Sequence, residues 1–128
     1  MTRKALLILA GCMIALTARA VADCRAHRGE HVVLYSTTDD PSVLMWDSRA
    51  RLRAYHAASF DVAQALLPHA LLVAPGTHAD VISCIADYVT SPLFTGPESA
   101  VGVIVTSGPS RGAARWVLGS DVRMFKKR

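Results

Sequence analysis

The sequence lacks most features that mark a membrane-spanning or nucleotide-binding protein. Its main apolar run, residues 5–18, has 14 residues, whereas a helix needs roughly 18 or more to cross a bilayer core. A glycine-rich phosphate loop, a paired-carboxylate motif, an internal repeat and a low-complexity tract are all missing. We therefore expect no transmembrane span in the mature chain and no cofactor.

Positive charge is also scarce once the N-terminal segment is set aside. Residues 1–22 hold three of the 14 Lys and Arg residues, which leaves 11 basic against 10 acidic side chains and a net charge of +1. Proteins that bind nucleic acid by charge have a strongly basic domain or face. The composition therefore predicts that nucleic acid is not a partner.

The N-terminal segment has the pattern of a secretory signal peptide. Arg3 and Lys4 precede the apolar run, and small residues follow it. Of two small-x-small sites, residues 18–20 and 20–22, the second leaves Asp23 just after the cut. We expect residues 1–22 to be removed and the mature protein to be periplasmic or secreted. The remaining 106 residues suit one domain.

A lipid anchor is the alternative interpretation of this segment. Residues 9–12, Leu-Ala-Gly-Cys, resemble a bacterial lipobox, whose cysteine becomes the acylated N-terminus. The apolar run continues past Cys12 through Leu16. This continuation favours ordinary export over anchoring through Cys12.

Two cysteines, Cys24 and Cys84, remain in the expected mature chain. In an oxidising compartment an even pair predicts one disulfide. The alternative is a zinc or copper site, because Cys24, His27 and His31 follow Asp23 with the spacing Cys-x2-His-x3-His. This arrangement lacks a second ligand cluster, so we predict the disulfide and no bound metal.

Turn residues divide the mature chain into short apolar runs, which is typical of a β-rich domain. The clearest case is a hairpin in which residues 107–112, rich in Gly, Pro and Ser, connect two strands and residues 120–122 then form a 3₁₀ turn. The expected strands are residues 31–35, 43–46, two strands within 71–84 around the turn 75–77, 101–106 and 113–119.

One helix is expected, from Ser59 at the N-cap to Pro68 as the stop. Arginine alternates with apolar residues in residues 49–54, so in a strand the three guanidinium groups would lie on one face. That face is either simply exposed to solvent or a binding stripe for an acidic partner. Residues 85–99 are expected to form a long loop.

Residues 71–122 contain a series of glycine, apolar and turn residues with a recognisable order. They are Gly76-Thr77, Val81-Ile82, Val103-Ile104, Gly108, Gly112, Trp116-Val117 and Ser120-Asp121-Val122. This series resembles the second half of a bacterial SH3-like barrel, although Arg115 stands where the family usually has the glycine before Trp-Val. The resemblance implies a small SH3-like barrel with one short helix in a single domain, residues 23–128. Exported bacterial members of this kind are often cell-wall or protein-binding modules.

Catalysis has weak support in the sequence. Residues 108–112 spell Gly-x-Ser-x-Gly, but a strand follows where a nucleophile elbow needs a helix, and no histidine comes later. His78 and Asp80 share one face of a predicted strand while Ser83 is on the other, and His56 and His69 are isolated. We predict that the protein is not an enzyme, with a small envelope enzyme or metal protein using its histidines as the alternative.

The function that remains is a noncatalytic binding module of the bacterial cell envelope, with a protein, a peptide or peptidoglycan as ligand. Aromatic side chains dominate interface energetics. We therefore predict that Trp116, Tyr88 and Phe94 bind the ligand, because the hairpin and the loop before it bring them toward one edge. Core packing is the competing role for Trp116.

Overall fold

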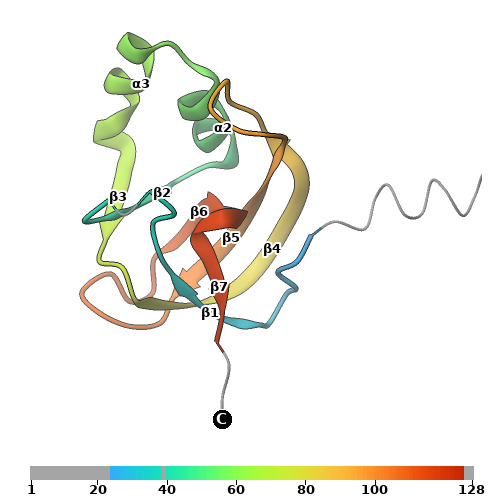
Figure 1. The fold of residues 1–128 in the computed structure, drawn as a ribbon. Coiled ribbons are helices and arrows are strands. Elements are labelled where there is room, and N and C mark those ends of the chain that lie inside the picture. The colour runs from blue at the N-terminus through green and yellow to red at the C-terminus, as the bar shows by residue number, and fades with distance from the viewer. Residues whose placement is uncertain (1–23, 39, 126–128) are drawn as a thin grey trace, which may run out of the picture.

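A computed structural model describes residues 24–38 and 40–125, so the predicted signal peptide and Cys12 lie outside the described residues. Within these residues the protein forms seven β-strands and two α-helices (Figure 1), which confirms the predicted mainly-β class. In the same part of the chain no helix is long and apolar enough to cross a membrane. The elements are β1 (His31–Leu34), β2 (Val43–Trp46), α2 (Arg49–Ala57), α3 (Phe60–Leu66), the 3₁₀ turn η1 (Leu67–His69), β3 (Ala70–Val73), β4 (Thr77–Val89), β5 (Glu98–Val105), β6 (Ala114–Leu118), the 3₁₀ turn η2 (Gly119–Asp121) and β7 (Val122–Met124).

The strands form one open antiparallel sheet in the order β3-β2-β6-β5-β4-β1-β7. The predicted hairpin is confirmed as β5 and β6. Gly108 and Gly112 in its turn have φ angles of 77° and 91°, which glycine adopts without steric cost. Residues 108–112 are therefore a hairpin turn, as predicted, and the 3₁₀ turn η2 follows β6.

Two strand predictions are wrong in detail. Residues 71–84 do contain two strands, but β3 pairs with β2, whereas β4 pairs with β1 and β5. β4 also continues through the first part of the predicted loop 85–99. Register shifts after Val81 and Ile85, with a φ of 53° at Asp87, let β4 bend and still pair with β5.

The arginine-rich segment is helical, which corrects the strand expected there. The hydroxyl of Ser48 accepts a hydrogen bond from the backbone N–H of Arg51 at 3.1 Å and so caps α2. Alanine, leucine and arginine are strong helix formers, and Leu52 is the buried residue of this helix. Arg49 and Arg53, four residues apart, therefore lie on one face of α2.

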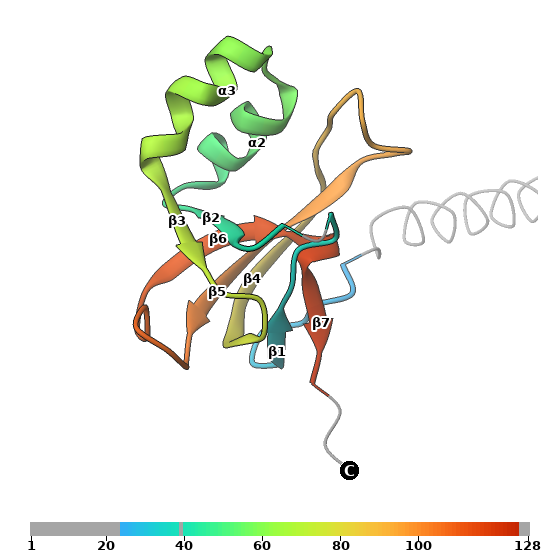
Figure 2. The ribbon, with the colours of Figure 1, turned by 60° about the vertical axis from the view of Figure 1, so that its left-hand side comes forward.

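The helix predicted from Ser59 is confirmed as α3, but the expectation of a single helix is wrong because α2 precedes it. Pro68 does not end α3 directly, since it lies within η1. The two helices stand together at one end of the sheet, and the loop between β4 and β5 rises beside α2 in both views (Figures 1 and 2). Figure 2 also places β1 and β7 away from the helices. The sheet thus has a helical end and an open end.

The core has two parts. The larger is built mainly from valine side chains of the sheet, which suits β-branched residues on a pleated surface. The smaller, which we call the aromatic cluster, lies between α2 and the sheet and recruits partly buried aromatic rings. Its fully enclosed members are Trp46, Leu52, Val89, Ala100 and Leu118, and its partly buried members are Tyr55, Leu66, Ala70, Tyr88, Phe94 and Trp116.

Cys24 and Cys84 form the predicted disulfide. Their Cα atoms are 6.2 Å apart, within the range of native disulfides, and they are 60 residues apart in the chain. The bond ties the segment before β1 to the middle of β4. Disulfides persist in oxidising compartments, so this one indicates a non-cytoplasmic location.

Candidate functional site

All three residues predicted to bind a ligand lie in the aromatic cluster. Trp116 of β6 is the register partner of Trp46 in β2, and its ring covers Gly102, where an added Cβ would be 3.4 Å away. Tyr88 comes from the end of β4 and Phe94 from the following loop. Each is partly buried. The structure thus brings Trp116, Tyr88 and Phe94 together, and part of the surface of each side chain is buried against the aromatic cluster.

Two arginines cover Tyr88. The guanidinium carbons of Arg49 and Arg53 lie 5.9 and 4.8 Å from the centre of its ring, within the range of cation–π attraction. Arg51 forms an ion pair with Asp47, whereas the described residues place no carboxylate within 4.0 Å of Arg49 or Arg53. Among the residues that the structure describes, this face of α2 therefore carries two positive charges without an ion-pair partner.

His56, three residues after Arg53 on α2, lines a groove that sequence reasoning missed. It has a volume of about 370 Å³ and separates the α2–α3 corner from the loop after β4. Phe60 and Leu93 flank it with 75% and 92% of their surfaces exposed. We call it the apolar groove. Its lining residues are Tyr55, His56, Ala58, Phe60, Ala63, Ser91, Pro92 and Leu93.

A second hollow, of about 520 Å³, lies next to the disulfide. Glu98 in its wall accepts a hydrogen bond from the backbone N–H of Ser120 at 3.2 Å. Among the described residues, Met124 is the only large exposed apolar side chain that lines this hollow. Large apolar side chains exposed together in one patch are a mark of a protein interaction site. The apolar groove is therefore the stronger candidate.

His56 lies at the base of the apolar groove, with ring centroids 5.0 Å from Tyr55 and 5.4 Å from Phe94. Burial lowers the pKa of His56 below its usual value near 6.5. The unfolded chain consequently binds this proton more readily than the folded protein. As the pH falls below about 6.5, protonation of His56 in the unfolded chain therefore lowers the free energy of unfolding. At higher pH His56 is neutral in both the folded and the unfolded state, and this effect is absent.

We expect the free energy of unfolding to fall between pH 8 and pH 5 more steeply in the wild type than in His56→Gln, which has no ring to protonate. Urea unfolding at several pH values measures the difference. His69→Gln is the matched control, because His69 is exposed on η1 and its replacement should leave the wild-type slope. A His56→Gln slope equal to that of the wild type would contradict the assignment.

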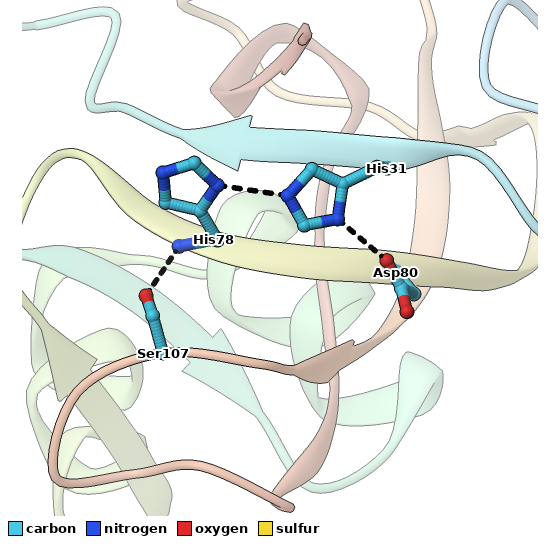
Figure 3. Close-up of polar contacts among 4 residues, drawn as sticks. All are labelled: His31, His78, Asp80 and Ser107. Carbon is cyan, nitrogen blue, oxygen red and sulfur yellow. Dashed lines mark hydrogen bonds and ion pairs between the residues drawn. The ribbon is translucent and has the colours of Figure 1, made fainter.

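A separate polar cluster lies on the outer face of β1 and β4. His31 is the register partner of Asp80, and His78 is two residues before Asp80. Asp80 Oδ1 is 2.7 Å from His31 Nδ1, and His31 Nε2 is 2.8 Å from His78 Nδ1 (Figure 3). The backbone N–H of His78 donates to Ser107 Oγ at 2.9 Å. The chain of contacts runs Asp80, His31, His78.

The sequence analysis placed His78 and Asp80 on one strand face but did not pair them with His31. The alternative metal cluster of Cys24, His27 and His31 is not assembled, because Cys24 bonds to Cys84 and the ring of His31 contacts Asp80 and His78. Asp23 lies outside the described residues. Within the described ranges, no three His, Cys, Asp or Glu side chains converge as metal ligands.

Known proteins give no indication of the function of this chain. No family model, curated protein or solved structure matches the chain.

Proposed function

We propose that this protein is a noncatalytic binding module of the bacterial cell envelope that holds an apolar, acidic segment of a partner protein. The observation that carries the proposal is the pair of large, exposed apolar side chains, Phe60 and Leu93, at the apolar groove. Exposed apolar side chains gathered at one groove form the kind of patch that marks protein interaction sites. A side chain of the partner would enter between them.

The charge next to the groove defines the partner further. Arg49 and Arg53 stand on Tyr88, in the same cluster as Phe94, and lack carboxylate partners among the described residues. Acidic residues flanking the apolar anchor of the partner would complement them. A peptide fits better than a glycan, because none of the groove-lining residues in the described chain carries a carboxylate or an amide to bind sugar hydroxyls.

The proposal includes an SH3-like barrel as the scaffold, in which the sheet stays open between its edge strands β3 and β7. Supporting features are the β5–β6 hairpin, the 3₁₀ turn η2 after it, and a last strand, β7, that returns to pair with β1. The proposal also places the mature protein in the periplasm or outside the cell. The signal-like residues 1–22 and the Cys24–Cys84 disulfide support export, and Cys12 offers lipid anchoring as the alternative.

Selection of random 12-residue peptides against the exported, oxidised protein tests the proposal. Enriched peptides should carry one large apolar residue flanked by Asp or Glu. Phe60→Ala combined with Leu93→Ala should weaken a selected peptide at least about tenfold, because truncating a hot-spot residue costs more than about 1 kcal/mol. Fluorescence anisotropy of the labelled peptide at low and high salt measures affinity and its electrostatic part.

Leu72→Ala is the matched control. Leu72 is 59% exposed on edge strand β3, outside the groove, so its truncation should leave peptide affinity and stability unchanged. The proposal fails if no peptide is enriched, or if the enriched peptides bind Phe60→Ala/Leu93→Ala as tightly as the wild type.

A further inference from the structure

The two rings at the centre of the polar cluster, His31 and His78, face each other through nitrogens rather than through carbon edges. We propose that His31 Nε2 and His78 Nδ1 bind one divalent transition-metal ion, Cu²⁺ in preference to Ni²⁺ or Zn²⁺. This site is on β1 and β4, whereas the segments that line the apolar groove, the α2–α3 corner and the loop after β4, are at the helical end of the sheet (Figure 2). The inference is therefore independent of the peptide-binding proposal.

Asp80 prepares one of the two nitrogens. A neutral imidazole has a proton on one ring nitrogen and a lone pair available on the other. The hydrogen bond made by one nitrogen determines which of the two carries the proton. Asp80 Oδ1 accepts from His31 Nδ1 at 2.7 Å, so the proton is on Nδ1 and the lone pair is on Nε2. Metal-binding histidines commonly donate their other N–H to a carboxylate in this way.

His78 supplies the second nitrogen. When both rings are neutral, its Nδ1–H donates to His31 Nε2, and the two nitrogens are 2.8 Å apart. When a metal ion binds between the two nitrogens, that proton moves to His78 Nε2, which points away from His31 (Figure 3). The exchange releases no proton from the cluster, because the His78 proton moves from Nδ1 to Nε2 through solvent. A neutral imidazole ligand results at each position.

The ligand type favours Cu²⁺. The two nitrogens are 2.8 Å apart, a hydrogen-bond separation, and a bound ion would replace that contact with two metal–nitrogen bonds of about 2.0 Å. Each ring turns outward about χ2 to aim its lone pair at the ion, and this torsion is soft. Imidazole nitrogen is a ligand for Cu²⁺, Ni²⁺ and Zn²⁺, and the affinity order favours Cu²⁺.

The surroundings hold the pair while leaving room for water ligands. Val32 and Ala79, the neighbours of His31 and His78 on the two strands, are fully buried and fix the backbone below the rings. The ring of Phe125 lies 5.4 Å from each histidine ring and covers one side. The side chain of His31 is 41% exposed and opens the other side to solvent.

Titration of the tag-free, oxidised protein with CuSO₄ tests the site. Calorimetry should give one Cu²⁺ per chain, and electron paramagnetic resonance should give an axial spectrum with nitrogen splitting. His31→Gln and His78→Gln should each weaken binding at least tenfold, and Asp80→Asn should weaken it about tenfold with the same stoichiometry, as for other outer-shell carboxylates.

His69→Gln is the control, since His69 is exposed on η1, and it should bind Cu²⁺ like the wild type. Thermal melts establish that each variant is folded. Unchanged Cu²⁺ binding in the folded double variant His31→Gln/His78→Gln would overturn the site. A Zn²⁺ affinity equal to or above that for Cu²⁺ would overturn the preference for Cu²⁺.

Discussion

Replacing Cys24 and Cys84 together with serine should lower the free energy of unfolding by about 4 kcal/mol, which is the chain-entropy value for a loop of this length. The two residues are 60 positions apart, so the reduced chain gains many unfolded conformations. Small domains are stable by only about 5–15 kcal/mol. Guanidinium titration of wild type and variant should therefore show a large shift of the midpoint.

Reduced wild-type protein is the natural comparison for this variant. Dithiothreitol should move the wild-type midpoint close to that of Cys24→Ser/Cys84→Ser and leave the variant unmoved. A variant whose midpoint equals that of the oxidised wild type would contradict the role given to the disulfide.

Trp46→Ala should cost about 3–5 kcal/mol, the usual range for removing a buried tryptophan. Trp46 is fully buried, and its ring packs 4.9 Å from that of Tyr55 beneath α2. Its indole N–H is buried with no hydrogen-bond partner among the described residues, and such a donor is itself destabilising. Trp46→Phe, which keeps a ring and removes that donor, should therefore cost less than half as much. Urea unfolding measures both changes.

Trp116→Ala provides the contrast. Trp116 is only partly buried, so its truncation should cost less than that of Trp46 and still be measurable. A Trp116→Ala protein of wild-type stability that no longer binds selected peptides would make Trp116 a ligand-binding residue, as the sequence analysis predicted. Equal stability of Trp46→Ala and the wild type would contradict the core assignment.

The sequence was most informative where pattern and local chemistry agree. The β5–β6 hairpin was predictable because apolar runs flank a turn whose glycines take positive φ. The arginine-rich segment was misread because the alternation of Arg and apolar residues has the period of a strand. Leu52 is the buried residue of α2. One buried residue does not give the repeated apolar positions by which a helix is recognised in a sequence. The available signal was Ser48, an N-cap residue three positions before Arg51.

The candidate sites were less predictable because they depend on register and on how elements meet. His31 and Asp80 are 49 residues apart and pair only because β1 and β4 align them. The apolar groove needs the corner between α2 and α3 next to residues 91–93. A slip of one residue in β1 against β4 would send the histidines to opposite faces, and nothing local in the sequence specifies that register.

The pairing of β7 with β1 also constrains when the chain is able to fold. Residues 32–34 pair with residues 122–124, and the N–H of Tyr35 donates to the carbonyl of Asp121 at 2.9 Å. Contacts so distant in sequence form slowly, because a long loop must close before they contribute. During synthesis the first strand therefore leaves the ribosome well before its partner exists. The sheet therefore cannot be complete until residues 122–124 have been synthesised.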